Sequence, residues 1–219
     1  MYLTSWSGGK DSCFACYRAI QNGYKISYLV NFISKEYRRV SFHGIEARLI
    51  RLQSGLAGIQ LVQGETTPDG YEQEFKKTVQ SLIPQGIKGM VFGDLYLDEH
   101  RQWVERVCRE LGIEAIEPLW KIDTEKILND FINEGFEAVV VSSQKKFISK
   151  EWIGSKIDKG FLEYLKTKPA VDICGENGEY HTFVVGGPLF KGRINIKESE
   201  VIERDGYWFL DIKKFEVIS

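Results

Sequence analysis

Short apolar runs alternate with longer segments of helical periodicity along the first half of the chain. The apolar runs, which predict strands, are Tyr2–Trp6, Ile26–Phe32, Ile59–Val62, Met90–Phe92 and, more weakly, Ala115–Ile116. Helical spacing is found between them, over Asp11–Asn22, Gly44–Gly55, Tyr71–Ile83 and Glu99–Leu111. Strands that alternate with helices are typical of βαβ units. We therefore expect an α/β fold with a doubly wound, mainly parallel sheet.

The pattern changes near residue 120. Asp123 or Thr124 can cap a helix that runs to about Asn133, and a second helix is expected near residues 155–167. The strand-like stretches of this part are Ala138–Val141, His181–Val185, Arg193–Lys197 and Tyr207–Ile212. The Asp-Gly pair in "ERDGYW" predicts a hairpin turn because both residues tolerate positive φ. We expect one domain over residues 1–120 and a smaller α+β domain over residues 121–219.

Composition and charge exclude several classes of protein. No apolar run approaches the ~20 residues that a membrane helix needs, and Lys10 and Asp11 interrupt the N-terminal segment before a signal peptide could form. We therefore expect no membrane association and a cytoplasmic location. The formal net charge of −2 argues against stable nucleic-acid binding through phosphate contacts. Four cysteines are too few for a disulfide scaffold.

The hexapeptide "SGGKDS" follows the first predicted strand and opens the first predicted helix. Gly8 and Gly9 would let backbone N–H groups face a ligand without a Cβ in the way, and the helix N-terminus adds unpaired donors. Lys10 supplies a mobile positive charge, and Ser7 and Ser12 supply hydroxyls. Together these features predict an anion cradle. Neither the Walker A pattern nor the dinucleotide-binding fingerprint is present.

Asp11 is the acidic residue of this hexapeptide, and two cysteines follow it. Asp11 would either bind Mg²⁺ near phosphates, hold Lys10 in place, or serve the helix dipole. Cys13 and Cys16 lie three residues apart on one helix face. A sulfur-carrying or iron–sulfur role is the alternative to packing, but a cluster normally needs four thiolates. We therefore favour buried packing residues.

Three further stretches place polar residues next to predicted elements. "FHGIEARLIRLQ" puts His43 before a helix. "VFGDLYLDEHRQWVERVC" puts Gly93 and Asp94 at the end of a strand and Arg101 on the helix that follows. "VDICGENGEYHTFVVGGP" gathers polar residues around glycines before a strand. A polar cluster of that density is hard to explain as core.

The motif S-G-G-x-D-S is the signature of the PP-loop ATP pyrophosphatases. Taken with "GD…R.WVERVC…PLW" and "CGENGEYHTFV", it makes the chain resemble the diphthine–ammonia ligase family in its short archaeal-type form, from Ser7 to about Pro188. The resemblance implies a PP-loop fold of the adenine nucleotide alpha hydrolase type. It also implies ATP-dependent amidation of diphthine, a modified histidine on translation elongation factor 2. Ammonium would be the nitrogen source, because Tyr2 stands where a glutaminase nucleophile would be.

The expected site residues fall into three groups. ATP and Mg²⁺ are expected at Ser7, Gly8, Gly9, Lys10, Asp11, Ser12, Asn31, His43 and Gly93, with Asp11 as the metal ligand and adenine near Val30–Phe32 by fold analogy. Catalytic roles are expected for Lys10, Asp94, Arg101, Glu176 and Glu179. The acceptor is expected to contact Asn177, Tyr180 and His181.

Several of these roles keep an alternative. Asp94 would bind Mg²⁺, order the substrate or cap a helix, and Arg101 would approach a phosphate, approach the diphthine carboxylate or be solvated. Glu176, Glu179 and Tyr180 would surround the quaternary ammonium of diphthine, and a carboxylate could take a proton from ammonium. A polar β-turn is the alternative for this loop.

Other functions stay open at this stage. The chain could be another PP-loop enzyme, such as a tRNA thiolase or a tRNA-modifying ligase, or a non-catalytic module that binds ATP or AMP. The carboxylate-rich second half favours an enzyme, and the acidic balance favours a protein acceptor over tRNA. The expected partners are elongation factor 2 and ammonium. A homodimer is an open alternative to a monomer.

Overall fold

The computed structural model describes residues 1–218, which divide into two compact units. Unit 1 consists of Met1–Ser7, Asp11–Ser41 and Glu46–Lys121. Unit 2 consists of Gly8–Lys10, Phe42–Ile45 and residues 122–218. Two short segments of the N-terminal half therefore cluster with the C-terminal half. Among the residues described, no helix is both long and apolar enough to cross a membrane.

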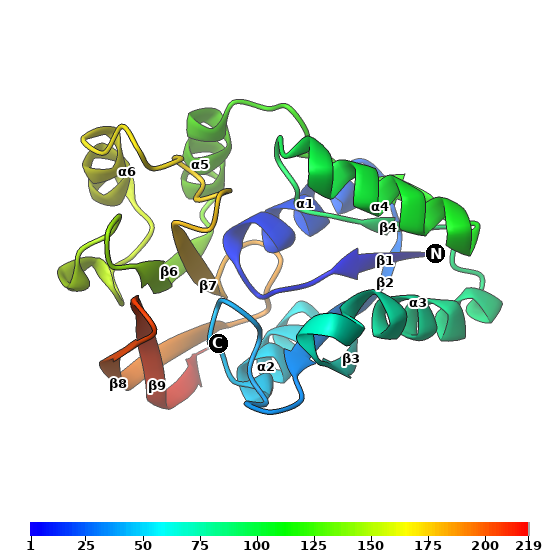
Figure 1. Cartoon of the computed structure of the whole chain (residues 1–219), viewed down its shortest axis with the longest axis horizontal. Helices are drawn as coiled ribbons and strands as arrows, with labels where there is room; N and C mark the ends of the chain where they lie inside the picture. The colour runs from blue at the N-terminus through cyan, green and yellow to red at the C-terminus, as the bar shows by residue number, and fades with distance from the viewer. Residues whose placement is uncertain (219) are drawn as a thin grey trace. The chain divides into compact units, whose positions relative to one another are not determined.

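A parallel sheet forms the centre of unit 1 (Figure 1). Its strands over the described residues are β1 (Tyr2–Ser5), β2 (Ile26–Ser34), β3 (Gln60–Thr66), β4 (Gly89–Val91) and β5 (Glu114–Ile116). They are arranged in the order β3-β2-β1-β4-β5, and every neighbouring pair is parallel. The helices between them are α1 (Lys10–Gln21), α2 (Ala47–Ala57), α3 (Tyr71–Leu82) and α4 (Asp98–Leu111), with short 3₁₀ turns at Pro68–Gly70 and Ile83–Gln85. The predicted doubly wound α/β fold is confirmed.

The strand order creates a switch point beside β1. The chain moves from β1 toward β3 first and then returns to β4 and β5 on the other side of β1. Because parallel crossovers are right-handed, α3 and α4 lie together on one face. Their buried residues share one core with the strands, formed by Leu3, Val30, Phe32, Phe75, Val79, Met90, Phe92, Val104 and Val107. Open sheets of this kind bind ligands where the carboxyl ends of the strands meet at the switch point.

An antiparallel sheet forms the centre of unit 2. Its strands are β6 (Glu137–Gln144), β7 (Tyr180–Gly186), β8 (Arg193–Arg204) and β9 (Tyr207–Ile218), in the order β7-β6-β9-β8 over the described residues. The helices α5 (Thr124–Asn133) and α6 (Lys159–Lys166), and a 3₁₀ turn at Lys150–Trp152, complete the unit. An α+β architecture is what the sequence pattern predicted for this part of the chain.

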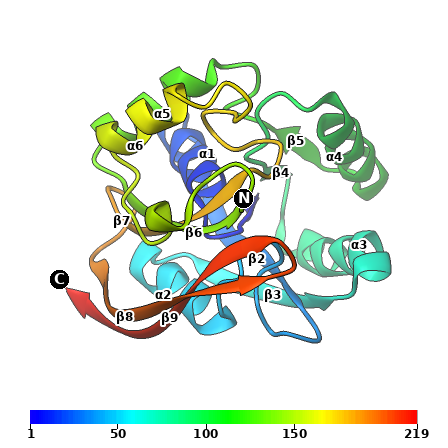
Figure 2. The same cartoon turned by 60° about the vertical axis from the view of Figure 1, so that its left-hand side comes forward.

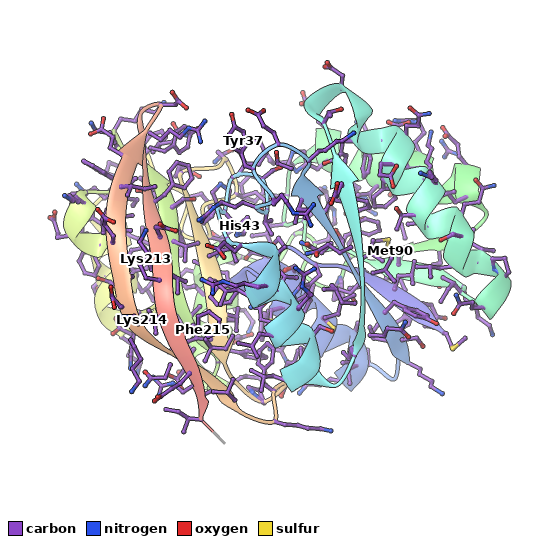
Figure 3. All side chains as sticks on the ribbon, turned by 90° about the horizontal axis from the view of Figure 1, so that it is seen from below. Tyr37, His43, Met90, Lys213, Lys214 and Phe215 are labelled. Atoms are coloured by element: carbon purple, nitrogen blue, oxygen red, sulfur yellow. The ribbon has the colours of Figure 1, made fainter. Side chains whose placement is uncertain are left out.

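Strands β8 and β9 form a long two-stranded ribbon, which Figure 2 shows in orange and red. The predicted hairpin turn is confirmed, because Asp205 and Gly206 both have positive φ, at 52° and 82°. Both strands are longer than predicted. Charged side chains occupy many of the added positions, and some pair across the ribbon, as Lys214 does with Glu198 at 2.5 Å. Figure 3 shows Lys213, Lys214 and Phe215 along β9.

Two helices begin later than predicted, for local reasons. Helix α2 starts at Ala47 instead of Gly44, because Gly44 has a φ of 69° and breaks the helical path. Helix α6 starts at Lys159 because the Asp158 carboxylate caps it by accepting from Phe161 N at 3.0 Å. The cap predicted at Asp123 is confirmed.

The aromatic core under α3 and α4 provides a stability test. Phe75 is fully buried, and its ring lies 5.1 Å from Trp103 and 5.7 Å from Phe32. We expect Phe75→Ala to lower the free energy of unfolding by about 3–5 kcal/mol, because it removes a large ring and leaves a cavity. Urea unfolding would measure this. Tyr37→Ala, at an exposed position, should cost less than about 1 kcal/mol; an equal loss in both variants would contradict this core.

Candidate functional site

The turn from β1 to α1 has the strand–turn–helix form expected for "SGGKDS". Gly8 has a φ of 83°, a left-handed conformation that favours glycine. In unit 1, Ser7 N donates to Ser12 Oγ at 3.3 Å, and the two hydroxyl oxygens are 3.1 Å apart. Ser7 and Ser12 are therefore brought together at the start of α1.

Gly93 lies against the first turn of α1. A Cβ at this position would be 2.8 Å from both the carbonyl carbon of Asp11 and the nitrogen of Ser12. These are backbone atoms and cannot move aside easily, so a side chain at residue 93 would push the end of β4 away from α1. Glycine is required here for close packing.

Asn31 belongs to a buried polar network. Its side chain is 1% exposed, and its Nδ2 donates to Trp6 O at 2.7 Å while its Oδ1 accepts from Gln63 Nε2 at 2.9 Å. The indole Nε1 of Trp6 donates to Gln53 Oε1 at 2.9 Å. Asn31 thus holds in place the backbone that follows β1. No motif in the sequence indicates a role for Trp6, Gln53 or Gln63.

A cavity of about 430 Å³ lies in unit 1 where β1 and β4 end. Its lining comes from both strand ends, from the start of α3 and from the first half of α4: Ser5, Tyr71, Phe92, Asp94, Glu99, His100, Trp103 and Val104. The Asp94 carboxylate is 3.2 Å from His100 Nδ1. Asp94 is therefore at the switch point, as its position after a strand predicted.

Arg101 faces carboxylates and an indole ring. Its Nε donates to Glu105 Oε1 at 2.7 Å and lies 3.5 Å from Glu117 Oε2, and its guanidinium lies 4.8 Å from the centre of the Trp120 ring. The Arg101 side chain is 39% exposed, so the guanidinium is also partly solvated. The guanidinium is held near the ends of β4 and β5.

Glu117 is a buried carboxyl that the sequence analysis missed. Its side chain is 7% exposed, and burial raises its pKa to about 7, with Arg101 opposing the rise and Asp94 and Glu105 adding to it. Within residues 1–218, Glu117 Oε1 and Trp120 Nε1 have no hydrogen-bond partner. Both belong to "EPLW", which follows β5. A carboxylate directly after a strand of a parallel sheet was the available signal.

Lys10 lies inside unit 2. Its side chain is 3% exposed, its Nζ donates to Cys174 O, and the Nζ lies 5.3 Å from the centre of the Tyr180 ring. Its backbone N donates to Thr182 Oγ1 at 3.0 Å. The expectation of a mobile charge is therefore wrong: burial and these bonds fix the ammonium group in place.

His43 and His181 form a pair of imidazoles in unit 2, with ring centres 4.7 Å apart. His43 Nδ1 lies 3.0 Å from Thr182 O, and because a carbonyl only accepts, Nδ1 carries the proton. Burial lowers the pKa of His43 to about 4, with the Thr182 bond opposing and Lys10 adding to the effect. The pKa of His181 lies well below its usual range, mainly because the ring is buried and also because His43 and Lys10 are near it. Both rings are neutral at pH 7.

The loop before β7 is held together by its own polar residues. Glu179 is 2% exposed, and its Oε1 accepts from Asp172 N at 2.9 Å and from Asn177 Nδ2 at 3.2 Å. Tyr180 is also buried, and its hydroxyl donates to Ile173 O at 2.6 Å. Glu179 and Tyr180 therefore shape the loop and offer little surface to an acceptor. Glu176 is only half-buried.

The two cysteines of α1 are packing residues. Cys13 and Cys16 are fully buried. Burial raises the pKa of Cys16 to about 12 and that of Cys13 well above its usual value, where the neighbouring Cys16 adds to it. Thiols in this state are poor nucleophiles. The preference for packing over sulfur transfer is supported.

Comparisons with known proteins cover nearly the whole chain. A family model described as the diphthamide synthase N-terminal domain matches residues 2–115, and one described as the diphthamide synthase C-terminal domain matches residues 123–218. Proteins named diphthine–ammonia ligase are 29% identical over 220 residues in Bos taurus and 30% identical over 220 residues in Rattus norvegicus. Each alignment covers 90% of this chain and 82% of the relative. A protein of the same name from Schizosaccharomyces pombe is 30% identical, and the alignment covers 36% of its length.

The chain is also similar to a solved structure. It is titled a predicted subunit of tRNA methyltransferase from Methanocaldococcus jannaschii DSM, and it aligns with a TM-score of 0.46 at 14% sequence identity. The alignment covers 85% of this chain and 97% of that chain. At this level of likeness nothing follows about function.

Glu117 gives a prediction for pH dependence. Its folded pKa of about 7 lies above the ordinary 4.5, so the contribution of Glu117 to stability falls as pH rises from about 4.5 to 7. The lowered pKa values of His43 and His181 act in the opposite direction, so the effect of Glu117 is measured as a difference from the wild type. Glu117→Gln cannot ionise, so we expect its free energy of unfolding, relative to that of the wild type, to rise by up to about 3 kcal/mol between pH 4.5 and pH 8 in urea unfolding. The exposed Glu114→Gln should show no such rise. A Glu117→Gln variant with the wild-type pH dependence would contradict the buried carboxyl.

Proposed function

The chain belongs to the diphthamide synthase family, and on this basis we propose that it is an ATP-dependent ligase that converts diphthine on translation elongation factor 2 into diphthamide. In this reaction the diphthine carboxylate attacks the α-phosphorus of ATP and pyrophosphate leaves. Ammonia then attacks the acyl carbon of the adenylate, AMP leaves, and the nitrogen loses a proton to become the amide.

The observation that carries the proposal is the position of the glycine turn. It connects β1, the central strand of the parallel sheet, to the N-terminus of α1, and the cavity containing Asp94 lies where β1 and β4 end. The N-terminus of a helix is the positive end of the helix dipole and favours anions. The arrangement favours a nucleotide with its phosphates at the turn and a second substrate beside it.

The phosphates of ATP are assigned to Ser7, Gly8, Gly9, Lys10, Asp11 and Ser12. The positive end of the α1 dipole would stabilise the charge of the departing pyrophosphate, and the Lys10 ammonium would contribute only as a fixed positive charge, because its bond to Cys174 O holds it in place. Asp11 and the hydroxyls of Ser7 and Ser12 form an all-oxygen donor set, which is the kind that Mg²⁺ prefers. The residues therefore fit a magnesium ion, which would add positive charge next to the leaving group. Asn31 and Gly93 would act indirectly, by shaping the turn.

The remaining site residues are assigned to the acceptor and ammonia. Asp94 would order the acceptor in the cavity, and Arg101 would attract its carboxylate or the α-phosphate. Glu176 would take the proton that ammonium must lose before it can attack. In this proposal residues 1–120 bind ATP, and the loop before β7 in residues 121–219 serves the amidation step. Asn177, His181 and the neutral His43 would contribute hydrogen bonds.

A direct assay tests the proposal. The full chain would be incubated with ATP, Mg²⁺, ammonium and elongation factor 2 that carries diphthine. We expect AMP and pyrophosphate in equal amounts, and a mass change of the factor that corresponds to replacement of a carboxyl oxygen by nitrogen. Production of ADP, modification of tRNA in place of the factor, or nucleotide binding without turnover would contradict it.

Two carboxylates of the loop before β7 should behave differently when each is changed to an amide. Glu176→Gln should reduce the amidation rate by about a hundredfold or more, since a proton acceptor is lost, and should leave ATP affinity unchanged. Glu179→Gln should instead lower the melting temperature, since a buried carboxylate that accepts two hydrogen bonds is replaced. Rate, ATP affinity and melting temperature would be measured for both. A Glu176→Gln variant that loses ATP affinity in proportion to rate would contradict this division.

A further inference from the structure

The cavity of unit 1 has an aromatic lining. Tyr71 begins α3, Trp103 lies on α4, and Phe92 follows β4. The rings of Tyr71 and Trp103 have their centres 5.9 Å apart and their planes at 40°. Tyr71 is 39% exposed, so a ligand can reach the cavity past its ring. Three elements thus bring three rings to one opening.

The Trp103 ring is held in a fixed orientation. Its Nε1 donates to Glu72 Oε2 at 2.8 Å, and Glu72 also accepts from Arg106 at 2.6 Å and from Lys76 at 2.6 Å. The ring of Phe75 packs edge to face against it. Because its polar group is already bonded, Trp103 offers a ligand in the cavity only its apolar ring.

The charged groups of the cavity are acidic. The carboxylates of Asp94 and Glu99 line it, together with the imidazole of His100. Carboxylates disfavour the phosphates of a nucleotide here, and aromatic faces combined with nearby negative charge favour a cation.

We propose that this cavity binds the trimethylammonium group of the acceptor, an inference that rests on the proposed function. A quaternary ammonium has no N–H to donate, so it is recognised by aromatic faces and by long-range attraction to carboxylates. Diphthine carries such a group together with the carboxylate to be amidated. A cation held between β1 and β4 would leave that carboxylate near Gly93, which packs against the first turn of α1. Acceptor binding would then extend into residues 71–104.

Binding of choline to the full chain tests the cavity without any reaction. Choline has the trimethylammonium group, and 3,3-dimethylbutan-1-ol is its neutral isostere. We expect choline to bind the wild type, and the neutral isostere to bind at least about tenfold more weakly, which corresponds to about 1.4 kcal/mol. NMR chemical shifts or tryptophan fluorescence would report binding.

Variants locate the binding site. Tyr71→Leu and Trp103→Leu should each weaken choline binding by about fivefold to tenfold, within the range of one cation–π contact. Tyr24→Leu is the matched control, since Tyr24 packs on Tyr2 near the amino end of β1, and it should bind as the wild type does. Glu99→Gln is an exposed change that should not affect folding. It should weaken choline and leave the neutral isostere unchanged.

The kinetics of amidation separate this inference from the proposed function. Tyr71→Leu should raise KM for the diphthine-bearing factor about tenfold and leave KM for ATP unchanged, and choline should compete with the factor. Choline binding without any amidation would overturn the proposed function and leave the cation cavity standing. Amidation with no choline binding and an unchanged KM in Tyr71→Leu would overturn the cavity. A loss of affinity for AMP in Trp103→Leu would also overturn the cation cavity, because adenine would then be the group that stacks on these rings.

Discussion

The close parallel packing of β1 between β2 and β4 is the constraint on which the site in unit 1 depends. The chain leaves β1 in one direction and returns on the other side, so groups distant in sequence meet where β1 and β4 end. Ser5, Phe92 and Asp94 line one cavity for this reason. Gly93 makes the arrangement possible, because its missing Cβ lets the end of β4 approach the backbone of Asp11 and Ser12.

Buried polar side chains hold the loops at the strand ends. A buried amide or carboxylate without partners is costly, so such groups occur where hydrogen bonds are available. Asn31 connects the exit of β1 to β3 through Trp6 O and Gln63, and Glu179 closes the loop before β7 through Asp172 and Asn177. Both residues looked like ligand contacts in the sequence. Their bonds make them supports for the neighbouring backbone.

Features set by interactions between residues close in sequence could be predicted, and features set by contacts between distant segments could not. The alternation of apolar runs and helical spacing predicted the parallel sheet, and Asp-Gly predicted the turn between β8 and β9, because these signals are local. The start of α2 was misplaced because Gly44 adopts a left-handed conformation that spacing does not reveal. The burial of Lys10 depends on partners from distant segments, such as Cys174, and the raised pKa of Glu117 depends on burial by the fold and on the nearby charge of Asp94. No pattern within one segment contains that information.

The two substrates proposed here impose opposite electrostatic demands. ATP is a polyanion and suits backbone N–H groups and the positive end of a helix dipole, whereas a trimethylammonium group suits aromatic rings and carboxylates. The β1–α1 turn provides the first environment, and the cavity with Asp94, Glu99 and Trp103 provides the second. Carboxylates beside the strand ends would repel triphosphate from the cavity and so limit ATP to the turn. In this proposal the negative charge that would attract the acceptor would also orient the nucleotide, and the diphthine carboxylate, itself an anion, would need Arg101 to enter.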